Sequence, residues 1–325
     1  MLYSHNELTD YEKDCTVFKN FTIFRFNPLL CGVLFFAAVL FSGCSKSSKK
    51  EGKIQIVACL PPIAFIASQI GGEYADTFSL LPEGKTPHDY SPRPKEIRDA
   101  AKAQLLLSTG MAFEQRITDA LKHRVKVADV SADIPRRHFE TAVEHSHSHH
   151  HHYGENCSAD SLDPHVWLSH AAAEKIAANI CNALIAVDPS NSENYLANFK
   201  AFQKRLAVSK TECTAKLSKF KGRNFYVYHP AFGYFADEFG LKQTPVEING
   251  RELSATQLAS VIRTAKEQNV KTIFVQPQFN PAPAEELARK IDGNVAPLDP
   301  LVYDLLKNFT AVSDAIAAGF NGGKK

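Results

Sequence analysis

The 325-residue sequence lacks an excess of charge of either sign, because 37 Lys and Arg are matched by 35 Asp and Glu, for a formal net charge of +2. No run of Lys and Arg alternates with aromatic residues, so nothing indicates a nucleic-acid surface. The HExxH pattern is absent, which argues against a zinc hydrolase. None of the seven cysteines forms a CxxC pair, which excludes the commonest cysteine-based metal and redox motifs. What remains is a globular composition, 44% hydrophobic and 22% charged.

The most apolar run lies near the N-terminus and is too short for a comfortable membrane span. It covers residues 27–41, follows Lys19 and Arg25, and ends at Ser-Gly-Cys44. This order resembles a bacterial lipoprotein signal, in which the cysteine becomes the acylated first residue of the mature chain. We therefore expect residues 1–43 to be a signal peptide and Cys44 to carry a lipid. A secretory signal with an incidental cysteine is the alternative.

Strand-like and helix-like segments alternate after a polar tether at residues 44–53, and this alternation predicts parallel α/β sheets. The pattern stops over residues 133–161, a polar loop that carries six of the thirteen histidines between His145 and His152. The expected strands cover 53–60, 78–81, 104–108, 124–130, 224–228, 271–275 and 294–298, and the expected helices cover 63–70, 94–103, 114–122, 170–187, 192–220, 232–239, 257–268, 284–290 and 305–320.

The helix expected over residues 192–220 is unusually long. Its apolar residues recur mostly at spacings of three and four, and its length is about 43 Å at about 1.5 Å per residue. A coiled coil is a weak alternative because the stripe is interrupted at Ser209. A helix of this length exceeds one small domain, so we expect it to span two. The predicted organisation is an N-terminal α/β lobe at 54–188, a linking helix at 189–221 and a C-terminal α/β lobe at 222–325.

Four candidate metal ligands occupy related places in this pattern. His229 and Asp299 directly follow predicted strands, His88 lies in the loop after one, and His165 lies at the end of the His-rich loop. Ligands of open α/β sheets collect at the carboxyl ends of strands, so these side chains are expected to meet in a cleft between the lobes. Three imidazoles with a carboxylate or water as fourth ligand suit zinc.

The local sequence around the three histidines strengthens the prediction. Each has a proline beside it, which stiffens the backbone, and Asp89 and Asp163 are candidate partners for the second ring nitrogens. Asp299 could instead form an Asx-type turn. The 145–152 cluster indicates metal affinity but leaves its purpose open between zinc collection, occupancy sensing and tolerated drift. Structural or surface roles are expected for the remaining histidines that we considered, which are His123, His138 and His170.

Four segments together resemble the zinc- and manganese-binding solute-binding proteins of ABC transporters (cluster A-I). They are PEGKTPHDYSPRP from Pro82, DPHVWL from Asp163, YHPAFGYF from Tyr228 and QPQFN from Gln276. The resemblance covers about residues 54–320 and implies two (β/α)4 lobes with parallel sheets joined by a long rigid helix.

The resemblance also implies the metal ligands. It assigns metal binding to His88, His165 and His229, and matches Asp299 to the carboxylate that follows the family's last strand. Manganese-binding members typically have Glu at the position of His229, so the histidine favours zinc. One departure is Pro87, where some zinc-binding members carry an acidic residue. The fourth ligand is therefore either Asp299 or water, and we favour Asp299.

The expected function is that of a zinc-uptake protein without catalysis. A monomer in the periplasm or on the outer face of the cell membrane, anchored through Cys44, would capture Zn²⁺ as cargo and deliver it to the permease of an ABC importer. No nucleic-acid partner is expected. Manganese binding within the same family, or a surface adhesin, is the alternative.

Overall fold

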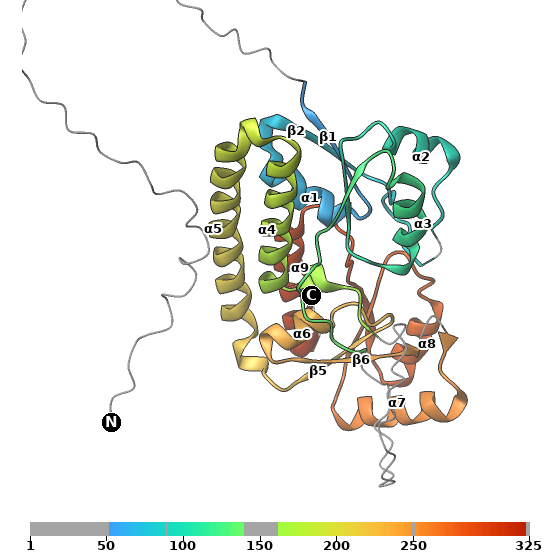
Figure 1. Cartoon of the computed structure of the whole chain (residues 1–325). Coiled ribbons are helices and arrows are strands. Elements are labelled where there is room, and N and C mark those ends of the chain that lie inside the picture. The colour runs from blue at the N-terminus through green and yellow to red at the C-terminus, as the bar shows by residue number, and fades with distance from the viewer. Residues whose placement is uncertain (1–51, 89, 140–161, 249–250, 323–325) are drawn as a thin grey trace, which may run out of the picture. The chain divides into compact units, whose positions relative to one another are not determined.

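Two parallel four-stranded sheets form the framework of residues 52–88, 90–139, 162–248 and 251–322, the part of the chain that the computed structural model describes (Figure 1). The first sheet has the order β2-β1-β3-β4 and the second the order β10-β9-β5-β6, with every pairing parallel. An antiparallel pair, β7 and β8, follows β6. The strands are β1 (Ile54–Ala58), β2 (Ala75–Ser79), β3 (Leu105–Ser108), β4 (Lys126–Asp129), β5 (Asn224–Val227), β6 (Lys242–Pro245), β7 (Glu247–Ile248), β8 (Arg251–Glu252), β9 (Thr272–Val275) and β10 (Asn294–Pro297).

The helices follow the alternation that the sequence predicts. The predicted helices at 170–187 and 305–320 coincide with α4 and α9. The helices are α1 (Pro61–Gly71), α2 (Pro94–Ala100), α3 (Ala112–Leu121), α4 (His170–Val187), α5 (Ser192–Leu217), α6 (Gly233–Phe239), α7 (Ala255–Glu267), α8 (Ala282–Lys290) and α9 (Leu305–Phe320), with short 3-10 turns at Gly72–Tyr74, Val166–Leu168, Pro189–Asn191 and Ser218–Phe220.

One strand prediction was wrong in its bounds, and the strand β6 was missed. The second strand lies at Ala75–Ser79 rather than 78–81, because it pairs with β1 from Ala75 onward. The apolar Leu80 and Leu81 that suggested the later position are buried just beyond its end. The strand β6 was not predicted, since its sequence KQTP is polar and ends in proline. Proline is tolerated there because β6 is at the edge of its sheet.

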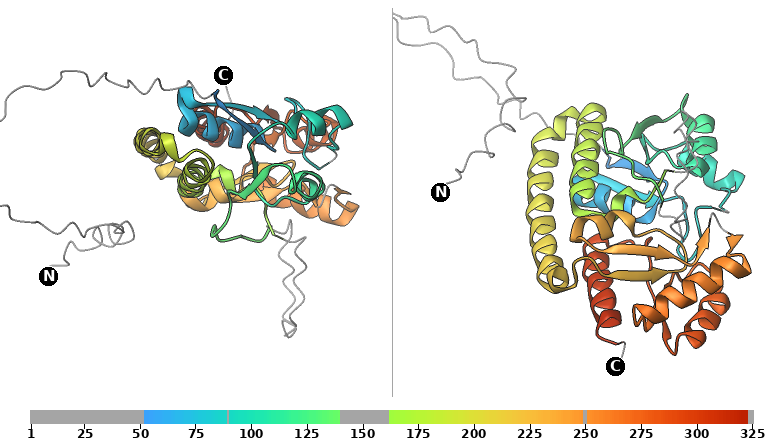
Figure 2. Two further views of the ribbon diagram at one scale, coloured as in Figure 1. Left: turned by 45° about the horizontal axis from the view of Figure 1, so that its top comes forward. Right: turned by 90° about the horizontal axis from the view of Figure 1, so that it is seen from below.

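The long helix α5 packs against helices from both halves of the chain. It lies beside α4, as Figures 1 and 2 show, and it also contacts α1 and α9. Its buried side chains form the predicted stripe, and the interruption at Ser209 is itself buried. The 3-10 turn Ser218–Phe220 completes the segment expected to be helical. A helix held along both halves leaves little freedom for bending between them.

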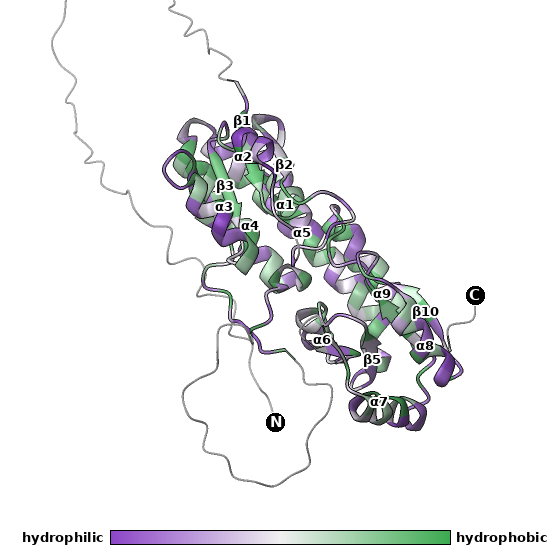
Figure 3. Ribbon diagram, turned by 90° about the vertical axis from the view of Figure 1, so that its right-hand side faces the viewer, coloured by the Kyte–Doolittle hydropathy of each residue, from purple (hydrophilic) through white to green (hydrophobic). Residues whose placement is uncertain are grey.

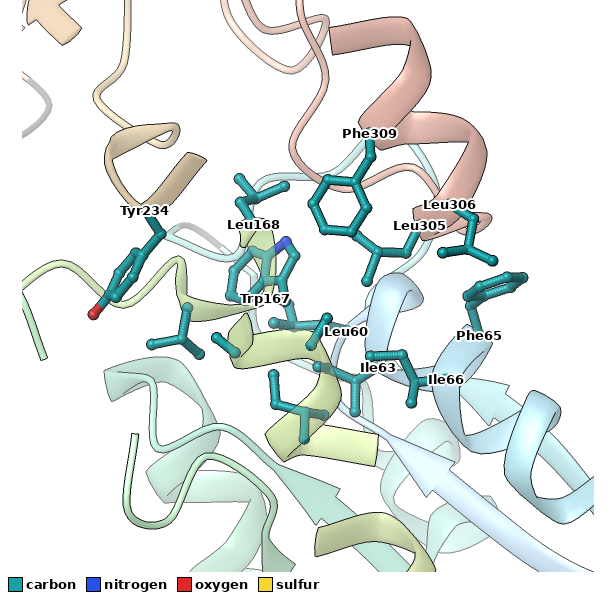
Figure 4. Packing of buried hydrophobic residues seen from close by; sticks show 14 of the residues in the cluster. Leu60, Ile63, Phe65, Ile66, Trp167, Leu168, Tyr234, Leu305, Leu306 and Phe309 are labelled. Carbon is teal, nitrogen blue, oxygen red and sulfur yellow. The ribbon is translucent and has the colours of Figure 1, made fainter. Parts of the chain in front are cut away.

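One hydrophobic core joins elements of the two sheets. Trp167 is fully buried and lies between Ile63 of α1 and Phe309 of α9, as Figure 4 shows. Its indole N–H donates to the carbonyl oxygen of Pro300 at 2.8 Å. Figure 3 shows how hydrophobic residues gather in β3 and α9, which contribute to this core. Since apolar interiors resist rearrangement, this shared core disfavours large movements between the halves.

A buried histidine of α4, His170, contacts the three helices α5, α6 and α9. The His170 ring at the start of α4 donates through Nδ1 to Glu238 Oε2 of α6 at 2.8 Å. Its Nε2 lies 3.1 Å from the hydroxyl of Ser209 in α5. The ring stacks on Phe309 of α9 with centroids 3.9 Å apart. His170 therefore has a structural role, and the polar break in the α5 stripe is its partner.

Several expectations fall on other parts of the chain. Cys59, Cys181 and Cys213 are buried free thiols. Within the described ranges no helix combines the length and apolarity needed to cross a membrane. Other expectations lie outside the described residues, namely the signal peptide 1–43, the lipidation site at Cys44, Asp89 as a ring partner and the 145–152 histidine cluster.

Candidate metal centre

Three histidines from distant parts of the sequence meet at one point. His88, His165 and His229 each offer a ring nitrogen, and these nitrogens all lie within 4.8 Å of one another. His88 Nε2 is 3.2 Å from His229 Nε2. His165 and His229 are buried, whereas His88 is exposed. The structure therefore brings together the three histidines predicted from sequence.

The His165 ring is held by the aspartate two residues before it. Asp163 Oδ1 accepts from the His165 backbone N–H at 2.9 Å and contacts ring Nδ1 at 2.8 Å. A carboxylate can only accept, so Nδ1 is the donor of this contact, and Nε2 is the ring nitrogen left to bind a metal. Both side chains are buried. The sequence-based suggestion that Asp163 serves as a ring partner agrees with this contact.

His229 is held by Glu247, which the sequence did not identify, and by Gln276, the first residue of the QPQFN segment. Its Nδ1 donates to Glu247 Oε1 of β7 at 2.8 Å. Gln276 fixes the His229 backbone, accepting from its N–H at 3.2 Å and donating to its carbonyl oxygen at 2.6 Å. Burial lowers the pKa of His229 despite the opposing Glu247 carboxylate. The ring is thus neutral near pH 7, the form that binds metals.

The space between the rings fits a single ion. The void, which the three histidines line together with six other residues, has a volume of about 10 Å³, the size that one water-sized species needs. Ligand nitrogens about 2.0–2.1 Å from a tetrahedral zinc are about 3.3 Å apart. The His88–His229 pair already has nearly this spacing at 3.2 Å. From the 4.8 Å limit on the trio, a contraction of at most about 1.5 Å would complete a tetrahedral edge.

Among the described residues, the fourth candidate ligand, Asp299, does not belong to the group formed by the three histidines. Asp299 Oδ1 accepts from the Leu301 backbone N–H and from Gln278 Nε2, both at 2.9 Å. Gln278 and Leu301 border the void between the histidines. Asp299 therefore contacts the residues that line the void and forms the Asx-type turn that was its alternative interpretation. Its role as fourth ligand stays a prediction, as does the water alternative.

The Glu247 contact predicts a measurable loss of metal affinity. Replacing Glu247 with Gln removes the charge that orients His229 and strengthens it as a donor, so zinc affinity should fall about 10-fold. Competition titration against a chromophoric chelator measures this change. Glu286→Gln on α8 is the matched control, since Glu286 is largely exposed and pairs with Lys290. Equal affinities for the two variants would contradict the role of Glu247.

Comparison with known proteins decides the family. The model of the family described as "Zinc-uptake complex component A periplasmic" matches residues 56–318. The chain belongs to this family. It is a solute-binding component of a zinc-uptake transporter and not an enzyme. This confirms both the resemblance seen in the sequence and the prediction of two α/β lobes with parallel sheets.

Individual relatives agree along most of the chain. The sequence is 32% identical over 277 residues to the high-affinity zinc uptake system protein ZnuA of Bacillus subtilis, covering 81% of this chain and 85% of that one. It is 29% identical over 262 residues to the protein of the same name from Yersinia pestis, covering 76% and 82%. A crystal structure of ZnuA superimposes with a TM-score of 0.74 at 31% identity, covering 82% of this chain and 99% of that one.

Proposed function

We propose that this zinc-uptake family member captures Zn²⁺ between His88, His165 and His229 and delivers it to the permease of an ABC importer. The convergence of three ring nitrogens within 4.8 Å carries the proposal. Carboxylates hold two of these rings in the tautomer that a metal requires. Imidazole donors suit a borderline-soft ion such as zinc better than manganese, which prefers oxygen.

Capture is proposed to proceed through the exposed histidine. His165 and His229 are buried and braced, so they form a prepared pair of donors. His88 is exposed and lies in the loop between β2 and α2. A contraction of about 1.5 Å or less among the three ring nitrogens would complete the tetrahedral spacing. Because the shared core and α5 restrain the two halves, local movement of this loop is the proposed route for binding and release. The 145–152 histidines are proposed to act as an accessory to this site.

Lipid attachment is proposed from the sequence around Cys44. The Ser-Gly-Cys44 end of the apolar run resembles a lipoprotein signal, and the polar residues 45–53 suit a tether to the first strand. The mature protein is proposed to be a monomer held at the membrane surface. Replacing Cys44 with Ser should abolish incorporation of labelled palmitate and release the protein from the membrane fraction. Retention of the label in this variant would contradict lipidation at Cys44.

Zinc-dependent growth tests the proposed function. A strain that lacks this gene should fail to grow when a chelator limits zinc, and added zinc should restore growth whereas added manganese should not. Calorimetry on the purified protein without residues 144–156 should give one tight zinc site that manganese does not displace. Rescue by manganese alone, or tighter manganese binding, would overturn the proposal. Loss of adhesion that zinc fails to restore would favour an adhesin instead.

A further inference from the structure

Asp163, the aspartate that holds the His165 ring, also forms an ion pair with Arg137, a residue that is not one of the three candidate ligands. Asp163 uses Oδ1 for His165 and leaves Oδ2 to accept from Arg137 Nη1 at 3.1 Å. The Asp163 side chain is fully buried, and the Arg137 side chain is 17% exposed. The backbones are also joined, because the Asp163 N–H donates to the Arg137 carbonyl oxygen at 2.8 Å. Each polar edge of this buried carboxylate therefore has a specific partner.

The first turns of α6 are shaped to receive this pair. A Cβ at Gly233 would lie 1.7 Å from Arg137 Nη1 and 2.9 Å from Asp163 Oδ2, so only glycine leaves room for the guanidinium. The Tyr234 hydroxyl accepts from the Arg137 backbone N–H and donates to the Asp163 carbonyl oxygen, both at 3.1 Å. Arg137 Nε donates to Asp237 Oδ2 at 2.8 Å. Three residues of α6, namely Gly233, Tyr234 and Asp237, thus lie against Arg137 and Asp163.

We propose that Arg137 is a positioning residue for zinc binding, which fixes the Asp163 carboxylate and through it the His165 ring. This inference rests on the proposed function of the trio. The same arginine ties the His165 segment to α6, which begins four residues after His229. Arg137 therefore sets the position of one metal-binding histidine relative to another across the two halves of the chain.

The physical reason is the freedom of an aspartate that has lost one partner. The terminal torsion of aspartate has broad, shallow preferences, so a carboxylate held by one oxygen can rotate. A buried carboxylate without its cation also pays a large desolvation cost, which favours its reorganisation toward water. Rotation of Asp163 would release the proton on His165 Nδ1 to either ring nitrogen. The zinc-binding lone pair on Nε2 would then be present in only part of the population.

Two variants remove the arginine contact by different routes. Arg137→Ala deletes the guanidinium. Gly233→Ala moves the guanidinium away from Asp163 but removes no charged group. Both should weaken zinc binding about 10- to 100-fold, the range found when partners behind metal ligands are lost. Arg263→Ala on α7 is the matched control, because Arg263 is 72% exposed and pairs only loosely with Glu267. Its zinc affinity should equal that of the wild type.

A spectroscopic readout separates positioning from general destabilisation. Nitrogen-15 NMR of the histidine rings in the metal-free protein should show one neutral tautomer of His165, protonated at Nδ1, in the wild type and the control. Arg137→Ala and Gly233→Ala should show a mixture of tautomers at His165 and an unchanged His229. A single Nδ1-protonated tautomer with wild-type zinc affinity in both variants would overturn the inference.

The proposed function and this inference fail in distinguishable ways. If His165→Ala leaves zinc affinity unchanged, the site itself is wrong. If His165→Ala weakens binding strongly while Arg137→Ala and Gly233→Ala behave as wild type, the site stands and the positioning role is wrong. Thermal unfolding of each metal-free variant shows whether it still folds. If one variant does not fold, the His165 tautomers of the other variant decide whether Arg137 positions the His165 ring.

Discussion

His229→Ala should lower zinc affinity about 100-fold or more. Four-ligand structural zinc sites are worth roughly 10–16 kcal/mol, so one ligand contributes about 3 kcal/mol, which corresponds to about 100-fold in affinity. The substitution also leaves Glu247, only 2% exposed in its side chain, without its imidazole partner. Titration calorimetry on a chain lacking residues 144–156 measures the effect without interference from the histidine cluster.

Two further variants make this result interpretable. His88→Ala changes an exposed ligand and should cause a similar loss of affinity. His123→Ala changes an exposed histidine just after α3 and should bind zinc as the wild type does. Wild-type affinity in either His88→Ala or His229→Ala would refute the three-histidine site.

Glu238→Gln should remove a large part of the protein's acid-sensitive stability. Burial favours the neutral form of Glu238, but hydrogen bonds from the ring and backbone of His170 and the charge of Lys210 outweigh it and lower the pKa to about 2. A carboxyl group whose pKa is depressed on folding stabilises the fold above its unfolded pKa of about 4.3. That contribution, on the order of 3 kcal/mol, is lost as the pH falls from about 4.5 to about 2.

Urea unfolding of the metal-free protein at several pH values tests this expectation. The wild type should lose stability steeply between pH about 4.5 and about 2, and Glu238→Gln should start less stable and lose less over that interval. Glu286→Gln should follow the wild-type curve, because Glu286 is an exposed member of an i,i+4 pair. Parallel curves for Glu238→Gln and the wild type would show that the His170–Glu238 pair does not supply this stability.

The sequence predicted the trio because each histidine carries a local signal. His229 directly follows a strand, and His88 and His165 lie in proline-rich loops beside predicted elements. The helices α4 and α9 were also predictable, since helix-forming sequence runs to clear stop signals at both. These features depend on residues within a few positions of one another, which is the range over which sequence patterns are informative.

The residues that brace the trio could not be predicted in the same way. Glu247 of β7 contacts His229 from 18 residues away. The strand β6 just before it is polar and ends in proline, so the sequence carried no strand signal there. Arg137 lies at the start of the His-rich stretch, where the sequence pattern stops, and its partners in α6 are about 100 residues distant. Gly233 resembles an ordinary glycine at a helix start until the guanidinium beside it is seen.

Zinc X-ray absorption spectroscopy tests the central claim most directly. The sample is the chain without residues 144–156, loaded with one zinc per molecule and purified without an affinity tag. The account predicts three imidazole nitrogens at about 2.0–2.1 Å and one further oxygen or nitrogen ligand. His88→Ala should reduce the imidazole number to two. A sulfur ligand at about 2.3 Å, or a spectrum with fewer than three imidazoles in the unsubstituted protein, would contradict a zinc site built from His88, His165 and His229.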